Sequence, residues 1–149
     1  MMDRNIRYQG LIIQDHKILL IRGFEILSGA SFWVIPGGHR EPGESEEECI
    51  LREMREETNL EVRVEKLLFE QRFPPDGPNA INRSYLCTPI AGFLSPGFEP
   101  EDDNFKMIAL RWFDLRNEKD WSLELQKDPF TYPQLVKIRM LLGYAPQAC

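Results

Sequence analysis

Glutamates crowd the 14 residues from 45 to 58, a stretch that contains neither glycine nor proline. A helix over these residues would carry four of them along one flank: Glu46, Glu53, Glu56 and Glu57. The last three stand three and four residues apart, where like charges cost about 0.2–0.5 kcal/mol per pair. Acidic residues in a last helical turn also oppose the helix dipole. Such a costly arrangement needs a physical reason.

Two interpretations account for this acidic flank. It can be a solvated face, relieved in part by Arg52 and Arg55, which we expect mainly on the other side of the helix. It can also be a metal site, because carboxylates without histidine or cysteine suit a hard cation such as Mg²⁺ or Mn²⁺. Charge clustering alone leaves the two interpretations about even.

The helix has its own start and stop signals. Ser45, followed three residues later by Glu48, predicts a capping box, and Pro42-Gly43 prevents an earlier start. Four residues share the side that we expect to face the core: Ile50, Leu51, Met54 and Thr58.

The turn before this helix completes a longer pattern. Gly38, Glu44, Arg52-Glu53, Met54, Arg55, Glu56-Glu57 and Leu60 stand at fixed offsets. This 23-residue pattern resembles the Nudix box, the loop-helix-loop signature of the Nudix hydrolase family, and every polar position is present. The closing glycine is replaced by Asn59, which tolerates a left-handed backbone best among non-glycine residues. We therefore expect Asn59→Gly to be neutral or mildly stabilising.

The resemblance implies roles for the residues of the box. Metal ligands would be Glu56, Glu57 and the Gly38 carbonyl, with Glu53 either a further ligand or the base that activates water. Arg52 would orient the glutamates, and Glu44 would close the loop or support the metal indirectly. The cofactor would be Mg²⁺, with Mn²⁺ as a substitute.

The elements around the box predict the fold class. Apolar runs at 6–14 and 17–22 suggest a hairpin that turns at Asp15-His16, and 32–35, 61–72, 82–94 and 107–115 suggest further strands. Residues 132–144 suggest a C-terminal helix. This order indicates an α/β protein with a mixed sheet between helices, and the resemblance implies a Nudix-type α/β/α sandwich over a single domain, residues 1–149.

Substrate contacts are expected outside the box. Candidate phosphate contacts are Arg22, Arg40, Arg72 and Arg83. Candidate base-stacking rings are Trp33, Phe32, Phe24 and Tyr85, although core packing is the more frequent role for each ring. Arg22, Trp33, Arg40 and Tyr85 are the four that we retain as substrate-binding predictions. The acidic run from Glu99 to Asp103 is either a solvated loop or the source of one more ligand, and His39 is expected to be an incidental surface residue.

Composition and net charge limit the classes of binding partner that we expect. The net charge of -6 disfavours polymeric nucleic acid and anionic membranes. No run of eighteen apolar residues and no export signal is present, so we expect a cytoplasmic protein. The three cysteines lack metal-type spacing, and we expect them to be reduced. We expect a monomer or a homodimer.

The resemblance implies Mg²⁺-dependent hydrolysis of the diphosphate linkage in nucleoside diphosphate derivatives. A nucleoside triphosphate stands slightly ahead of ADP-ribose, although Pro74 and Pro75 lie at the offsets where ADP-ribose enzymes of the family often carry proline. The alternative is a nucleotide sensor that has the domain without the chemistry. Intact Glu53, Glu56 and Glu57 weigh against it, because a pure binder gains little from their mutual repulsion.

Overall fold

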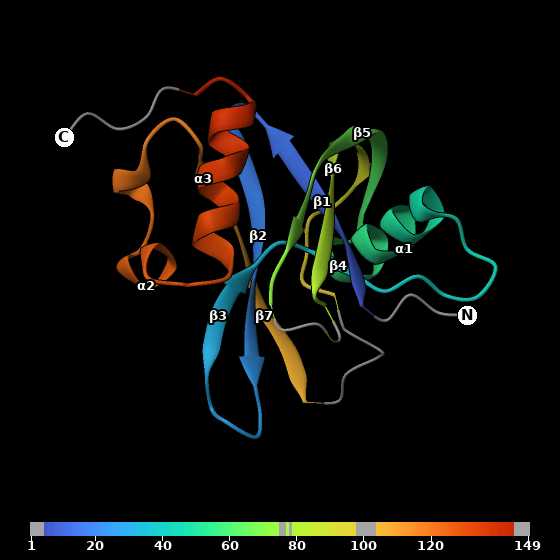
Figure 1. Cartoon of the computed structure of the whole chain (residues 1–149), viewed down its shortest axis with the longest axis horizontal. Coiled ribbons are helices and arrows are strands. Elements are labelled where there is room, and N and C mark those ends of the chain that lie inside the picture. The colour runs from blue at the N-terminus through green and yellow to red at the C-terminus, as the bar shows by residue number, and fades with distance from the viewer. Residues whose placement is uncertain (1–4, 75–76, 78, 98–103, 145–149) are drawn as a thin grey trace.

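The computed structural model describes residues 5–74, 77, 79–97 and 104–144, and its centre is a mixed sheet of seven strands. Helix α1 covers one side of the sheet, and α2 and α3 lie on the opposite side (Figure 1). This arrangement is the α/β sandwich that the sequence predicts. The elements, in chain order, are β1 (Ile6–Gln14), β2 (Lys17–Glu25), β3 (Ser31–Val34), β4 (Gly37–Gly38), α1 (Glu46–Thr58), β5 (Leu60–Arg72), β6 (Ile81–Gly92), β7 (Phe105–Asp114), a 3-10 turn (Glu118–Asp120), α2 (Leu123–Gln126) and α3 (Thr131–Leu141).

Strand β1 lies at the centre of the sheet and organises the rest. It pairs antiparallel with β2 and β4 and parallel with β6, and β5 continues the sheet beyond β6. The β1–β2 turn passes through Asp15 and His16, whose φ angles of 52° and 66° are those of a tight hairpin turn. The predicted hairpin is confirmed.

Helix α1 forms as its sequence signals predict. The Ser45 side chain accepts a hydrogen bond from the Glu48 backbone, and the Glu48 side chain accepts one from the Ser45 backbone, so both halves of the capping box are present. The helix ends at Asn59, whose φ of 63° and ψ of 17° are left-handed. Both predicted ends of the helix are confirmed.

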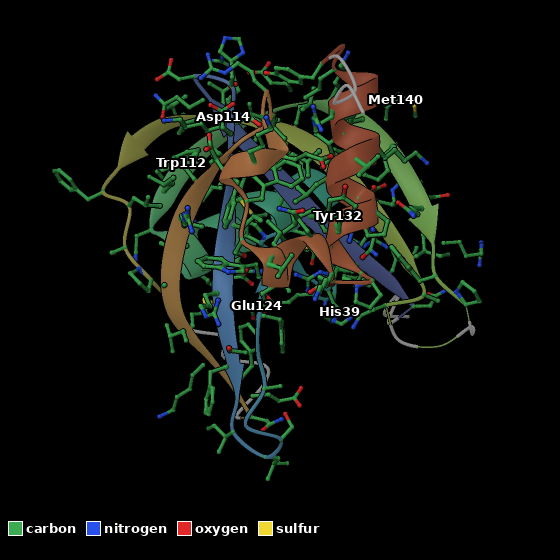
Figure 2. The ribbon with its side chains drawn as sticks, turned by 90° about the vertical axis from the view of Figure 1, so that its left-hand side faces the viewer. His39, Trp112, Asp114, Glu124, Tyr132 and Met140 are labelled. Atoms are coloured by element: carbon green, nitrogen blue, oxygen red, sulfur yellow. The ribbon has the colours of Figure 1, made fainter. Side chains whose placement is uncertain are left out.

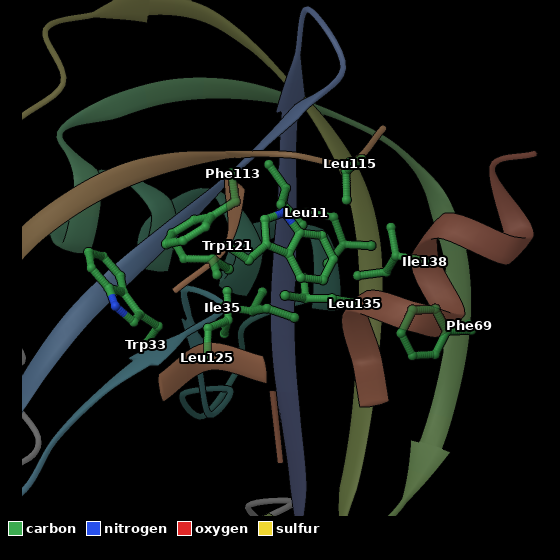
Figure 3. Close-up of a cluster of buried hydrophobic side chains, with 12 residues drawn as sticks. Leu11, Trp33, Ile35, Phe69, Phe113, Leu115, Trp121, Leu125, Leu135 and Ile138 are labelled. Atoms are coloured by element: carbon green, nitrogen blue, oxygen red, sulfur yellow. The ribbon is translucent and has the colours of Figure 1, made fainter. Parts of the chain in front are cut away.

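Two apolar clusters hold the layers together. One joins α2 and α3 to the sheet and includes Leu11, Trp33 and Leu135 (Figure 3). The other joins α1 to the sheet and includes Ile12, Ile50 and Met54. Leu11 and Ile12 are adjacent in β1 and fully buried on opposite faces, as expected for a strand covered on both sides.

Several boundaries differ from the sequence expectation. Strand β2 continues to Glu25 because β3 and β7 pair with it on both sides, and these pairings are not visible in the sequence. The short β4, the 3-10 turn and α2 were not predicted. Cys49 and Cys87 are buried thiols. Within the described part of the chain, no helix is long and apolar enough to cross a membrane.

Candidate active site

Arg52 is the centre of the acidic group on α1. Its guanidinium donates to both carboxylate oxygens of Glu44, at 2.7 and 3.0 Å, and to Glu53 Oε1 at 2.7 Å. A longer contact of 3.3 Å reaches Glu56 Oε2, and Nη2 also donates to the His39 carbonyl at 2.9 Å. Arg52 therefore ties the glycine loop to three glutamates. The expectation that Arg52 lies mainly away from the acids is wrong, because its long side chain reaches back over the helix flank.

Burial makes this charge pairing necessary. Glu53 is fully buried and Glu57 is 3% exposed, although both are acidic. A buried carboxylate is stable only with partners. Glu53 has Arg52, and Glu57 Oε1 accepts a hydrogen bond from the Gly37 backbone at 3.1 Å. Arg55 points elsewhere and pairs with Glu61 at 2.7 Å.

The same contacts set the protonation of the group. Hydrogen bonding from Arg52 lowers the pKa of Glu44 from its ordinary value of 4.5. Hydrogen bonding to Glu44 in turn raises the pKa of Arg52, so the guanidinium stays charged. Glu44 also accepts from the Glu41 backbone at 2.9 Å, which closes the loop before α1.

A side chain at position 38 would meet the buried Glu53 carboxylate, which would have to shift to make room for it. A Cβ there would lie 2.6 Å from Glu53 Cδ, closer than real Cβ contacts. The backbone of β4 can therefore lie directly against the buried carboxylate, with no side chain between them. Pairing of Tyr8 with Gly38 in the sheet fixes this approach.

The donor set fits a hard divalent cation. Glu53, Glu56, Glu57 and the Gly38 backbone offer only oxygen atoms, which suit Mg²⁺ or Mn²⁺ rather than zinc. Because Gly38 has no side chain, its backbone carbonyl can come close enough to the Glu53 carboxylate to share a cation with it. Among the residues that the structure describes, no three acidic, histidine or cysteine side chains are grouped closely enough to hold a metal ion. Glu53 instead accepts from Arg52, and Glu57 accepts from the Gly37 backbone N–H.

A pocket of about 570 Å³ opens beside this acidic group. Gly37, Gly38 and Glu57 form one wall. Three phenylalanines line other parts of it: Phe32 from β3, Phe105 from β7 and Phe130 at the start of α3. Arg7, Asp128 and Thr131 add polar groups. The pocket thus places aromatic rings next to one carboxylate of the Nudix-like box, that of Glu57.

Arg7 is held rigidly at this pocket. Its Nη2 donates to the Ile35 carbonyl at 2.8 Å, and its Nε donates to Gln9 Oε1 at 3.2 Å. Gln9 is buried and bonded to Ser84 and Gln134 at 3.0 and 2.8 Å. A cation whose orientation is fixed in this way can meet an anionic ligand at little entropic cost.

The four predicted substrate residues do not line this pocket. Trp33 is 6% exposed and packs edge-on against Phe113, with centroids 5.1 Å apart, so its ring belongs to the core. Arg22 stacks on Trp33 and pairs with Glu124 at 3.1 Å. Arg40 lies over the Tyr8 ring.

Tyr85 belongs to a separate polar cluster at the start of α1. Its hydroxyl donates to Glu46, which also accepts from Arg83 at 2.8 Å. Arg83 additionally pairs with Glu70 at 2.7 Å. Arg83, which the sequence suggests as a phosphate contact, is therefore already paired with two glutamates. Of the candidate rings, only Phe32 reaches the pocket.

Other predicted positions have mixed outcomes. His39 is half-buried and lines the pocket, near the N-terminal end of α3 in Figure 2, so it is not the incidental surface residue that we expected. Glu99 to Asp103 and Pro75 lie outside the described residues, whereas Pro74 is exposed. Sequence reasoning missed Arg7, Phe105 and Phe130. No spacing links them to the box, because they come from β1, β7 and the start of α3.

Comparisons with known proteins identify the family of the chain. The NUDIX domain model matches residues 5–132. An ADP-ribose pyrophosphatase of Methanocaldococcus jannaschii is 31% identical over 89% of this chain and 70% of its own length. An NAD-capped RNA hydrolase NudC of Stutzerimonas stutzeri is 30% identical over 67% of this chain and 36% of its own, so the chain spans about a third of that relative.

A solved structure supports the fold. A Nudix hydrolase of Nitrosomonas europaea superimposes with a TM-score of 0.70 at 21% identity and covers 99% of this chain and 98% of its own. The family match spans most of the chain, and two residues of the box, Gly38 and Glu57, line the pocket. The chain therefore belongs to the Nudix family and is a Nudix hydrolase, one of a class of enzymes that generally use divalent metal ions and act on small nucleotide substrates.

Proposed function

We propose that this Nudix hydrolase uses Mg²⁺ to cleave the diphosphate linkage of a nucleoside diphosphate derivative. The observation that carries the proposal is the 570 Å³ pocket, in which Gly38 and Glu57 meet three phenylalanine rings. A ligand that spans it has an anionic end and a flat aromatic end, as a nucleotide does. In the reaction, water attacks one phosphorus, the bridging P–O bond breaks, and each product keeps a phosphate.

The residues of the box divide the work between them. Glu53, Glu56, Glu57 and the Gly38 carbonyl would hold the metal, and Glu53 either joins the ligands or accepts the proton of the attacking water. Bound Mg²⁺ supplies charge neutralisation for the diphosphate and lowers the pKa of water. Arg52 orients Glu53 and Glu56 through the hydrogen bonds described above, and Glu44 fixes Arg52. Arg52 and Glu44 are therefore positioning residues.

The aromatic part of the pocket would hold the base. Phe32 and Phe105 lie with centroids 5.9 Å apart, and Phe130 stacks against Phe73 at 4.6 Å. Stacking on such rings contributes about 1–3 kcal/mol per base. Arg7 also lines the pocket and supplies a cation that its bond to the Ile35 carbonyl holds in place.

Two substrates of this class are the first to test. The sequence places a nucleoside triphosphate slightly ahead, whereas the Methanocaldococcus jannaschii relative is named for ADP-ribose. Incubation of each with the protein and Mg²⁺, followed by separation of products, distinguishes them. Nucleoside monophosphate plus pyrophosphate supports the first substrate, and AMP plus ribose 5-phosphate supports the second.

A matched variant ties the activity to the pocket. Phe130→Leu keeps an apolar side chain but removes the ring, so it should raise KM several-fold with a smaller change in kcat. Lack of product from a panel of nucleoside triphosphates, ADP-ribose, NADH, dinucleoside polyphosphates and nucleotide sugars, with Mg²⁺ or Mn²⁺, would contradict the proposal. Nucleotide binding without turnover would then favour the sensor alternative.

A further inference from the structure

Asn59 does more than replace the closing glycine of the box. Its left-handed backbone lets its N–H cap α1 by donating to the Arg55 carbonyl at 3.1 Å. The side chain makes two additional bonds, because Nδ2 donates to the Ser95 carbonyl at 2.9 Å and to Ser95 Oγ at 2.7 Å. Glycine could adopt the same backbone conformation but could make neither side-chain bond. The position therefore gains a tie to a segment 36 residues further on.

The tied segment, residues 95–97, closes the carbonyl end of α1. Ser95 N–H donates to the Thr58 carbonyl and Gly97 N–H to the Glu57 carbonyl, both at 3.1 Å. These are two of the carbonyl groups that a helix end leaves without an intrahelical partner. Two backbone donors also offset the negative end of the helix dipole, next to the glutamates of the last turn.

The segment also lies close against the helix. A Cβ at Gly97 would overlap the Glu56 carbonyl oxygen, so only glycine lets the backbone come this near. Gly92, at the end of β6, has a φ of 96°, and a Cβ there would overlap the Asn59 carbonyl oxygen. Gly92 and Gly97 thus let the chain between them pack closely against the end of α1. The Asn59 amide then holds this chain in place through its bonds to Ser95.

We propose that Asn59 is a positioning residue: by fastening residues 95–97 to the end of α1, it holds the Glu56-Glu57 turn in the geometry that binds the metal. This inference rests on the proposed function of those glutamates. The contacts fit the role, because Gly97 touches the backbone of both residues, through the Glu57 carbonyl and beside the Glu56 carbonyl. The residue that departs from the box pattern thereby strengthens the site. The structure also changes our expectation for Asn59→Gly. This variant loses both bonds to Ser95, and we now expect it to bind the metal more weakly.

The test compares Asn59→Gly with Asp15→Gly. Asp15 also has a positive φ, 52°, but lies in the β1–β2 turn, so its variant controls for glycine in a left-handed position. Ser95→Ala removes the Oγ bond and keeps the carbonyl bond, and we expect it to fall between wild type and Asn59→Gly. Two quantities are measured on each full-length protein well below its melting temperature: amide exchange at Ser95 and Gly97, and Mn²⁺ affinity by electron paramagnetic resonance.

In Asn59→Gly we expect amide exchange at Ser95 and Gly97 to speed up about tenfold, because two hydrogen bonds that hold the segment are lost. We expect Mn²⁺ affinity to fall about tenfold, which is the low end for loss of a group that supports metal ligands. Asp15→Gly should match the wild type in both.

Two results would overturn the inference alone. One is unchanged exchange at Ser95 and Gly97 in Asn59→Gly. The other is faster exchange with unchanged Mn²⁺ affinity, which would make the tie purely structural. A wild type that binds no Mn²⁺ overturns the proposed metal site and the positioning role together, so the two failures are distinguishable.

Discussion

Replacement of Arg52 by methionine tests the charge network at the centre of the site. Methionine has a similar unbranched stem, so the change removes the guanidinium and little else. Glu44 then loses both of its arginine bonds, and fully buried Glu53 loses its 2.7 Å partner. Removing one partner of a buried ion pair costs about 3–5 kcal/mol. Because Arg52 is 16% exposed, we expect the lower end, about 3 kcal/mol at neutral pH.

The loss should depend on pH with a defined sign. Arg52 lowers the pKa of Glu44 in the folded protein below 4.5, so ionised Glu44 stabilises the wild type above that pH. This contribution disappears as the pH falls through the folded pKa and Glu44 becomes protonated. The difference in unfolding free energy between wild type and Arg52→Met should therefore shrink in acid.

The assay is urea unfolding of both proteins without metal, at neutral pH and below pH 4.5. In thermal unfolding, a loss of about 3 kcal/mol in unfolding free energy corresponds to a melting temperature lower by about 6–12 °C for a domain of this size. Arg55→Met is the matched control on the same helix. Arg55 pairs with Glu61, and both side chains are about half exposed, so this variant should lose much less stability than Arg52→Met. Equal losses for the two variants, or a gap that stays constant in acid, would refute the reasoning.

Other substitutions test single parts of the site. Glu56→Gln or Glu57→Gln should abolish most Mg²⁺-dependent hydrolysis without lowering the melting temperature in metal-free buffer, since each removes a repelling charge; a sharp drop would make these glutamates structural. Gly38→Ala should lower stability by about 1–3 kcal/mol in urea unfolding, and kcat with it, because the methyl group would displace the Glu53 carboxylate. Trp33→Leu should destabilise the core by about 1–3 kcal/mol with KM unchanged, whereas a selective rise in KM would place Trp33 at the substrate.

Local signals in the sequence were enough to predict helix α1 and both of its ends. The capping box, the left-handed Asn59 and the spacing of the glutamates depend on residues within about one turn of each other, so the chain order alone encodes them. The hairpin turn at Asp15-His16 is local in the same sense. For the same reason, the Nudix-like box could be recognised before any contact was known.

Only the tertiary structure decided how the site is completed. Arg52 reaches Glu44 across eight residues because the loop folds back onto the helix, and Asn59 meets Ser95 across 36. Trp33 enters the core instead of the pocket because pairing of β3 with β2 sets which face it occupies. The pocket joins β1, β3, β7 and the start of α3, whose relative positions depend on sheet register and layer packing. These relations are carried by contacts between distant segments, and periodicity along the chain does not contain them.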